Sequence, residues 1–418
     1  MRRTVHIVGA GLAGLAAAVR LARGPARIVV HEATAHPGGR CRSYFDRAIG
    51  MAIDNGNHLV LSANHAVCEF ARAIGSEAGL VGPKAADFPF VDLKTNERWT
   101  LRINNGPPFW IFNPGRRAPG TRLGDYLKLA RLLRAPRDVP VAQVVDCAGA
   151  LYDRLVHPLL LAALNVDPRE GSAVLASAIV RETLLRGGSA CRPLIAREGL
   201  GPVFIEPALR KLAERGAEVR LEHELRALQF ADGRVCGLDF GDGLMTLGEG
   251  DAVILAVPPH AAAAMVPDLQ VPSSYRAIAN AHFRTEVPPG VPPITGVVGG
   301  TVEWLFAFDG RLSVTVSNAD RLMDVPRATL AQTLWHEVSK VTGIATEMPP
   351  WQIVRERRAT FAATPAENAR RPGAKSRWDN LFLAGDWTAT GLPATLEGAA
   401  RSGHRAADLV AAFVKDAA

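Results

Sequence analysis

A glycine-rich turn close to the amino terminus constrains the fold more than any other feature. Residues 9–14 read G-x-G-x-x-G and comprise Gly9, Ala10, Gly11, Leu12, Ala13 and Gly14. An apolar run at 4–8 precedes the turn, and an Ala- and Leu-rich run at 12–22 follows it. Strand, turn and helix in this order build a parallel sheet, and the helix start presents free N–H groups to a phosphate. The three glycines permit the tight turn, close approach of a pyrophosphate and close helix packing, so the motif predicts a dinucleotide-binding unit.

A second apolar run, at 27–31, ends at an acidic residue. Glu32 lies 18 positions beyond Gly14, with Ala33 beside it. A carboxylate at this place accepts hydrogen bonds from both ribose hydroxyls and repels a 2′-phosphate. We therefore expect Glu32 and Ala33 at the adenosine ribose, and we expect a cofactor other than NADP.

Two polar segments then favour FAD over NAD. Gly38, Gly39 and Arg40 form a second glycine-rich loop, and Arg40 can bind a phosphate through two parallel hydrogen bonds. NAD dehydrogenases do not require this second pair of glycines. The following segment comprises Asn55, Gly56, Asn57 and His58. We expect Gly56 to let backbone lie against a flat ring, with His58 near the flavin or the substrate.

The carboxyl-terminal part carries the matching motif. An apolar run at 381–384 leads to Gly385 and Asp386, and a last helix is expected at 396–414. Asp386 can bond the ribityl chain or a water that bridges the phosphates. The helix start at Leu396 would direct its positive end to the flavin pyrimidine and stabilise a reduced, anionic ring.

The Rossmann rhythm is interrupted twice along the chain. Strand-like runs recur near 217–230, 235–240 and 252–257, with a hairpin turn expected at Asp232-Gly233. We therefore expect an α/β protein with a discontinuous FAD-binding domain at 1–80, 200–262 and 375–418. The ranges 81–199 and 263–374 form the expected inserted, mixed α+β substrate-binding domain, which includes a helical part.

Composition bounds the remaining classes. The net charge is +7 with a pI of about 9.4, and the arginines are scattered, without a zinc-finger, homeodomain or RNA-recognition signature. We expect no nucleic-acid partner.

The five cysteines are odd in number and contain no C-x-x-C pair, which indicates a reducing compartment without a disulfide framework or metal site. The apolar start is better explained by the nucleotide turn than by a secretion signal, and no other run suggests a membrane span. A cytoplasmic protein is expected.

Together these motifs resemble the flavin-containing amine oxidase and phytoene desaturase superfamily over nearly the whole chain. Several stretches are similar to one subgroup, the squalene-associated FAD-dependent desaturases, which are understood as hydroxysqualene dehydroxylases. These stretches are DNGNHLVLS at 54–62, HPLLLAALN at 157–165, RLSVTVSNAD at 311–320, ERRATFAATP at 356–365 and LAGDWTATGLPATLEGAARSG at 383–403.

The resemblance implies a Rossmann-type, GR2-like FAD domain and reduction of hydroxysqualene to squalene for hopanoid synthesis. It also implies a long isoprenoid substrate, an external electron donor for the flavin, and backbone contact of Leu225 with adenine, from a strand at 218–228. No cysteine follows Cys236, which excludes the C-terminal cysteinyl–flavin bond of some amine oxidases, so non-covalent FAD is expected.

The departing hydroxyl of such a substrate would need a proton donor. The candidates are His58, Glu303, Asp320 and Glu356. Arginines on both sides of Glu356 also fit a structural ion pair at that residue.

Other readings remain open at this stage. One is a flavin amine oxidase or a phytoene or carotenoid desaturase. Another is a prenyl-binding module without redox chemistry, which would not need the complete flavin signature that this chain retains.

The mixture of apolar and basic residues at 123–134 suggests either a helix lying on an anionic membrane, at its inner face, or a core helix with a basic edge.

Overall fold

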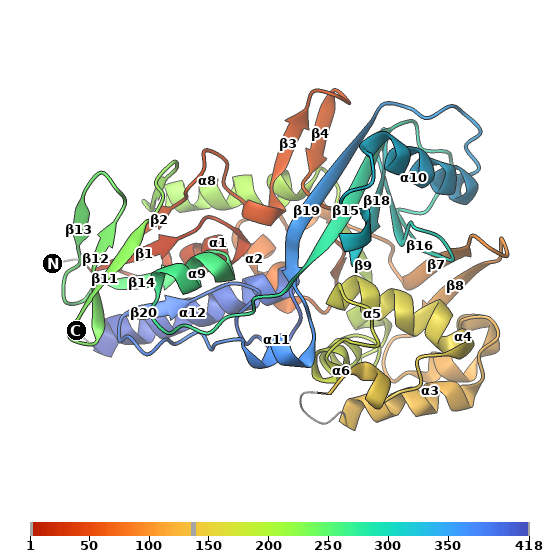
Figure 1. The fold of residues 1–418 in the computed structure, drawn as a ribbon, viewed down its shortest axis with the longest axis horizontal. Helices are drawn as coiled ribbons and strands as arrows, with labels where there is room; N and C mark the ends of the chain where they lie inside the picture. Colours follow the sequence, from red (N-terminus) through yellow and green to blue (C-terminus); the bar gives the residue numbers. More distant parts are fainter. Residues whose placement is uncertain (1–2, 135–138, 417–418) are drawn as a thin grey trace.

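A parallel sheet organises the part of the molecule that contains both chain ends. The computed structural model describes residues 3–134 and 139–416. Its five-stranded parallel sheet has the order β10-β2-β1-β14-β20 (Figure 1). The strands are β1 (Thr4–Val8), β2 (Arg27–His31), β10 (Glu218–Arg220), β14 (Ala252–Leu255) and β20 (Leu381–Leu383). The sheet thus joins segments that lie far apart in the sequence.

The two faces of this sheet are covered differently. On one face α1 (Leu12–Leu21), α8 (Glu206–Glu214) and α12 (Leu396–Asp416) pack together. Contact between α1 and α12 is close, because a Cβ on Gly403 would lie 2.2 Å from the Ala13 carbonyl oxygen. Alternate residues of β14 divide between the faces: Ile254 joins the core under the helices, and Val253 joins the core on the opposite side.

An antiparallel sheet with the order β11-β12-β13 packs in that second core. Its strands are β11 (Ala227–Ala231), β12 (Arg234–Asp239) and β13 (Leu244–Thr246). Asp232 and Gly233, with φ of 49° and 76°, form the tight turn between β11 and β12. The hairpin expected from Asp-Gly is therefore confirmed.

A seven-stranded sheet forms the second large layer, with the order β19-β15-β18-β17-β16-β7-β8. Its strands are β7 (Ala86–Asp92), β8 (Arg98–Ile103), β15 (Tyr275–Arg284), β16 (Ile294–Val298), β17 (Trp304–Phe308), β18 (Arg311–Val316) and β19 (Trp351–Phe361). Helix α10 (Arg327–Thr342) packs against the face formed by Ala279, Ala281 and Phe283. Their neighbours Asn280 and His282 lie on the other face, where polar residues are brought towards the 54–58 segment.

Shorter elements complete the structure. The helices are α2 (His65–Ala73), α3 (Leu123–Leu129), α4 (Gly149–Leu151), α5 (His157–Leu164), α6 (Ala173–Glu182), α7 (Gly188–Cys191), α9 (Pro259–Met265) and α11 (Pro365–Ala369). The small sheets pair β3 (Ser43–Asp46) with β4 (Met51–Asp54), and β5 (Val60–Leu61) and β6 (Leu80–Val81) with β9 (Pro193–Ala196). Helices α3 to α6 gather at one end of the molecule (Figure 1).

Two expected elements are wrong in their extent. The strand expected at 218–228 ends at Arg220, because Glu222 adopts a left-handed backbone with φ of 53°, and Leu225 lies in the loop before β11. The helix expected at 123–134 is α-helical only to Leu129 and continues as a 3₁₀ helix over Ala130–Arg134. All five cysteines are free. Among the described helices, none combines the length and apolarity needed to cross a bilayer.

Candidate functional site

The glycine turn shapes an opening at the carboxyl ends of β1 and β2. Gly9 has φ of 105°, and a Cβ there would lie 2.5 Å from the Ala256 carbonyl oxygen. A Cβ on Gly14 would lie 1.9 Å from the Gly9 carbonyl oxygen. At Gly11 a Cβ would meet no atom within 4 Å. Two glycines are therefore required by packing, whereas Gly11 faces open space at the start of α1, where a phosphate group fits.

The acid at the end of β2 is held in position by the same turn. One Glu32 carboxylate oxygen accepts a hydrogen bond from the Ala10 N–H at 2.9 Å, and the other accepts one from the Thr34 N–H at 3.0 Å. The His223 N–H donates to the Glu32 carbonyl oxygen at 2.8 Å, which brings the 223–225 loop beside this edge. The buried Leu225 therefore lies in a loop next to the acid, although not in a strand.

The second glycine loop lies against the first. The Gly38 N–H donates to the Ala10 carbonyl oxygen at 2.9 Å, and Gly11 and Gly38 form a parallel bridge. Gly38 and Gly39 have φ of 112° and 55°, a conformation that favours glycine. The loop therefore places Arg40 at the same opening.

Arg40 links the amino-terminal and carboxyl-terminal motifs. Its Nη2 lies 2.8 Å from Oδ1 of Asp386, and its Nη1 donates to the Ala359 carbonyl oxygen at 2.6 Å. The Arg40 side chain remains 45% exposed, whereas that of Asp386 is 8% exposed. The attraction of Asp386 raises the pKa of Arg40. The pair leaves a cation at the surface of the crevice, accessible to an anionic ligand.

Two hydrogen bonds to neighbouring elements hold the Gly385–Asp386 turn in place. The Gly385 N–H donates to the Ser402 hydroxyl of α12 at 2.8 Å, and Trp387 Nε1 donates to the Val257 carbonyl oxygen at 2.9 Å. Helix α12 starts soon afterwards, at Leu396. The turn and the helix start are thereby fixed relative to the parallel sheet.

Arg371 also supports this turn, and sequence reasoning missed it. Its Nη2 donates to the carbonyl oxygens of Asp386 and Thr388 and to the Thr390 hydroxyl. The guanidinium lies over the Phe361 ring at 4.8 Å, and the residue is 7% exposed. Burial lowers the pKa of Arg371 to about 10, so the side chain stays charged at neutral pH. Its only sequence signal was a position between two family-like stretches.

The 55–58 segment contacts the seven-stranded sheet. Asn57 Nδ2 lies 3.2 Å from the Thr315 hydroxyl and 3.3 Å from the Val314 carbonyl oxygen, while its Oδ1 is buried without a partner among the described residues. The Asn55 N–H donates to the Arg42 carbonyl oxygen at 3.0 Å. This arrangement links the segment to the inner face of the sheet.

Gly56 lies between two polar groups. A Cβ on Gly56 would lie 3.4 Å from Asn280 Nδ2 and 3.8 Å from His58 Nε2. Burial, followed by the positive charge of Arg40, lowers the pKa of His58 to about 4. His58 is therefore neutral near pH 7 and suited to hydrogen bonding rather than to supplying a proton.

The other three proton-donor candidates, Glu356, Asp320 and Glu303, have different surroundings. Glu356 on β19 is close enough to contribute to the field at Arg40. Asp320 accepts a long hydrogen bond of 3.4 Å from the Ala277 N–H. Glu303 accepts one of 2.8 Å from the Ser317 N–H, and its own N–H contacts the Thr315 carbonyl oxygen at 3.4 Å. Burial raises the pKa of Glu303 to about 7.

A row of three histidines runs past the end of β2, which the sequence pattern did not indicate. His6 Nδ1 lies 3.0 Å from His31 Nε2, and His31 Nδ1 lies 2.9 Å from His223 Nδ1. Burial lowers the pKa of His6 to about 4 and that of His31 to about 3. His6 and His31 are therefore neutral near pH 7.

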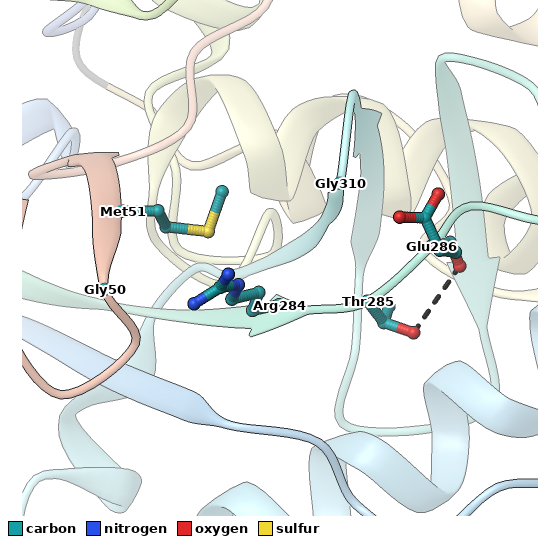
Figure 2. Close-up of a pocket in the computed structure, with 6 residues that line it drawn as sticks. All are labelled: Gly50, Met51, Arg284, Thr285, Glu286 and Gly310. Carbon is teal, nitrogen blue, oxygen red and sulfur yellow. Dashed lines mark hydrogen bonds between the residues drawn. The ribbon is translucent and has the colours of Figure 1, made fainter.

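A surface hollow of about 480 Å³ lies elsewhere, between the β3–β4 turn and the ends of β15 and β18 (Figure 2). Its lining comprises Gly50, Met51, Arg284, Thr285, Glu286 and Gly310. None of these belongs to the glycine or Gly-Asp motifs. The hollow is therefore separate from the crevice described above.

The residues around this crevice fit a flavin cofactor. The open side of Gly11, the accessible cation of Arg40 and the unpartnered Asn57 Oδ1 all offer contacts that protein atoms do not fill. These are the contacts that a pyrophosphate and a flavin ring require.

Comparison with known proteins supports this reading. The family model described as flavin containing amine oxidoreductase matches residues 12–411. Hydroxysqualene dehydroxylase of Rhodopseudomonas palustris is 62% identical over 99% of both chains, and that of Sinorhizobium fredii is 59% identical over 98% of both. Among solved structures, cyclohexylamine oxidase from Brevibacterium oxydans aligns with a TM-score of 0.73 at 16% identity, covering 100% of both chains. An oxidoreductase from Methanosarcina mazei gives a TM-score of 0.73 at 14% identity, covering 97% of this chain and 100% of the other.

The fold and the crevice together define a flavin-dependent oxidoreductase. The solved structures, at their low identity, bear on the fold alone. The chain belongs to the flavin-containing amine oxidoreductase family and groups within it with the hydroxysqualene dehydroxylases.

Proposed function

We propose that this protein is a hydroxysqualene dehydroxylase, which uses non-covalently bound FAD to reduce hydroxysqualene to squalene. The observation that carries the proposal is 62% identity to a relative of that name over 99% of both chains. The crevice supports it independently, because Gly11, Arg40 and Asn57 offer contacts there that protein atoms do not fill.

In this proposal, residues from the amino-terminal and carboxyl-terminal parts of the chain together hold FAD. Gly9 to Gly14 and Arg40 bind the pyrophosphate, and Glu32 with Ala33 binds the adenosine ribose, beside Leu225. Asn55 to His58 lie along the flavin ring. Asp386 binds the ribityl chain, and Leu396 presents the start of α12 to the flavin. Bound FAD, once reduced, supplies the hydride for the reaction.

The reaction replaces a carbon–oxygen bond with a carbon–hydrogen bond. The alcohol R–OH takes up one hydride and one proton, and R–H and water are released. The protein must orient the hydroxyl-bearing carbon, exclude bulk water and deliver the proton to the departing oxygen. A continuous apolar cluster suits a hydrocarbon, and it includes Trp304 and Phe306 of β17 together with Trp387 and Phe361.

Glu303 is the proton donor in this proposal. Its backbone N–H contacts the carbonyl oxygen of Thr315, the residue whose hydroxyl also contacts Asn57 of the 55–58 segment. With a pKa raised to about 7, a large fraction of this carboxyl carries its proton at neutral pH. His58, Asp320 and Glu356 are then assigned supporting roles in positioning.

Two partners follow from the chemistry. Each turnover consumes two electrons, so an external donor must reduce FAD again. The substrate is a neutral isoprenoid that partitions into lipid, which favours a cytoplasmic protein working at the inner face of a membrane.

We also propose the discontinuous division into an FAD domain at 1–80, 200–262 and 375–418 and a substrate domain from the remaining ranges.

Product analysis tests the activity. Flavin-loaded protein is incubated with hydroxysqualene and a chemical reductant without oxygen, with a panel of amines in air, and with phytoene and an oxidant. We expect squalene from hydroxysqualene alone. Peroxide with an amine in air, or a longer polyene from phytoene under an oxidant, would overturn the proposal in favour of an oxidase or a desaturase.

A further inference from the structure

Three large apolar side chains are exposed close together at the helical end of the molecule. Phe109 and Phe112, in the 3₁₀ helix Phe109–Phe112, are 64% and 61% exposed, and Leu127 of α3 is 60% exposed. The 3₁₀ helix contacts α3. An exposed apolar group of this kind marks an interaction site in a soluble protein.

The underlying packing holds these side chains on one rigid surface. Trp110 and Tyr126, each adjacent in sequence to an exposed residue, are buried and meet edge to face at 5.4 Å. The Tyr126 hydroxyl accepts a hydrogen bond from the Ala118 N–H at 3.2 Å. The surface is therefore built into the fold and is not a frayed loop.

The same segment has a marked excess of basic over acidic residues. Residues 109–134 contain six basic residues and one acid, a net charge of +5 of the +7 for the whole sequence: Arg116, Arg117, Arg122, Lys128, Arg131 and Arg134, with Asp125. Asp125 is engaged in the first turn of α3, where it accepts a hydrogen bond from the Arg122 N–H at 2.8 Å. None of the six cations forms a salt bridge with an acid in the ranges that the structure describes.

We propose that this surface, formed by Phe109, Phe112 and Leu127 and flanked by those cations, docks the protein on an anionic lipid bilayer. Apolar side chains beside unpaired cations match the acyl boundary and the charged headgroups of such a membrane. The contact is not a helix lying flat, because Tyr126 and Leu132 face the core. Phe109 and Phe112, which precede the helix, supply most of the apolar contact.

The position of the surface also suits delivery of the substrate, a point that rests on the proposed function. Trp110 and Tyr126 belong to the same apolar cluster as Phe361 and Trp387 beside the Asp386 turn. An isoprenoid that leaves the bilayer at this surface therefore enters beside the apolar cluster that extends to the Asp386 turn.

Vesicle co-sedimentation tests the docking. Flavin-loaded protein is mixed with vesicles of phosphatidylcholine alone or with phosphatidylglycerol. We expect binding to the anionic vesicles only, weakened by salt. Combined Phe109→Ser, Phe112→Ser and Leu127→Ser changes should reduce the partition coefficient by at least about tenfold. Each of Lys128→Gln and Arg131→Gln should reduce it about fivefold at low salt.

Phe45→Ser is the matched control, because Phe45 is 67% exposed on β3, far from α3 (Figure 1). It should bind vesicles as the unchanged protein does, and all variants should keep their melting temperature and flavin content. Equal binding of the triple variant, or no binding of the unchanged protein, overturns the docking surface. Turnover of detergent-solubilised hydroxysqualene distinguishes this failure from failure of the proposed function, since it requires no membrane.

Discussion

Replacing Gly11 by alanine separates folding from cofactor binding. Gly11 has φ of −73° and ψ of 177°, which alanine adopts freely, and its Cβ would meet no atom within 4 Å. Alanine lowers the entropy of the unfolded chain, which stabilises by about 0.4–1 kcal/mol. It is also a poorer N-cap than glycine for α1, which costs a similar amount. These effects offset each other, so Gly11→Ala should change the free energy of unfolding by less than about 1 kcal/mol.

The same methyl group should strongly weaken FAD binding. It would occupy the space where the pyrophosphate approaches the N–H groups at the start of α1. Hydrogen bonds to charged groups contribute about 1.5–3 kcal/mol each, so losing one or two of them predicts a rise in Kd of at least about tenfold. Fluorescence titration of FAD-free protein measures this Kd, and urea unfolding measures the stability.

Gly14→Ala is the control for a packing defect. Its Cβ would lie 1.9 Å from the Gly9 carbonyl oxygen, so the variant should unfold more easily, by more than about 2 kcal/mol. If Gly11→Ala binds FAD as tightly as the unchanged protein, the space above Gly11 is not the phosphate site. If it unfolds as easily as Gly14→Ala, the geometric reasoning is wrong.

Three further predictions concern buried titratable side chains. Arg371→Met should destabilise the protein by about 2–4 kcal/mol in urea unfolding, because two backbone carbonyls lose their donor; an unchanged midpoint would contradict this role. The depressed pKa values of His6 and His31 mean that the unfolded chain takes up protons first as pH falls below 6.5. Stability should therefore be full above pH 6.5 and fall by up to about 2 kcal/mol per histidine by pH 5, and a flat profile would refute it. The turnover rate should decline as pH rises through about 7, the pKa of Glu303, and Glu303→Gln should be about 100-fold slower without that titration. An identical pH profile in the variant would remove Glu303 as the proton donor.

Local signals predicted the parallel core well. Apolar runs bounded by glycine or an acid gave β1 and β2 with their observed limits, and Asp232-Gly233 gave the hairpin. Each of these depends on neighbours in the sequence: the strand is fully buried, or the turn needs left-handed backbone. Glu32 and Arg40 were predicted as cofactor-binding residues from the same kind of signal, because each follows directly on a recognisable element, and their roles stay a prediction.

Long-range contacts were beyond the reach of such signals. The break after Arg220 depends on a left-handed Glu222 whose N–H bonds the Thr34 carbonyl oxygen. Arg371 supports the Asp386 turn by hydrogen bonds, yet nothing in its flanking residues indicates this. The exposure of Phe109 was not predicted, because exposure depends on which neighbours pack beneath the side chain. Tertiary packing, rather than propensity, decided each of these positions.

A single anaerobic turnover tests the central claim most directly. Purified protein whose FAD has been fully reduced, with excess reductant removed, is mixed with hydroxysqualene. The flavin spectrum and the products are followed together. We predict that oxidised flavin returns and that one squalene forms per flavin. Flavin that stays reduced while no squalene forms, in folded and fully loaded protein, would contradict the proposed function.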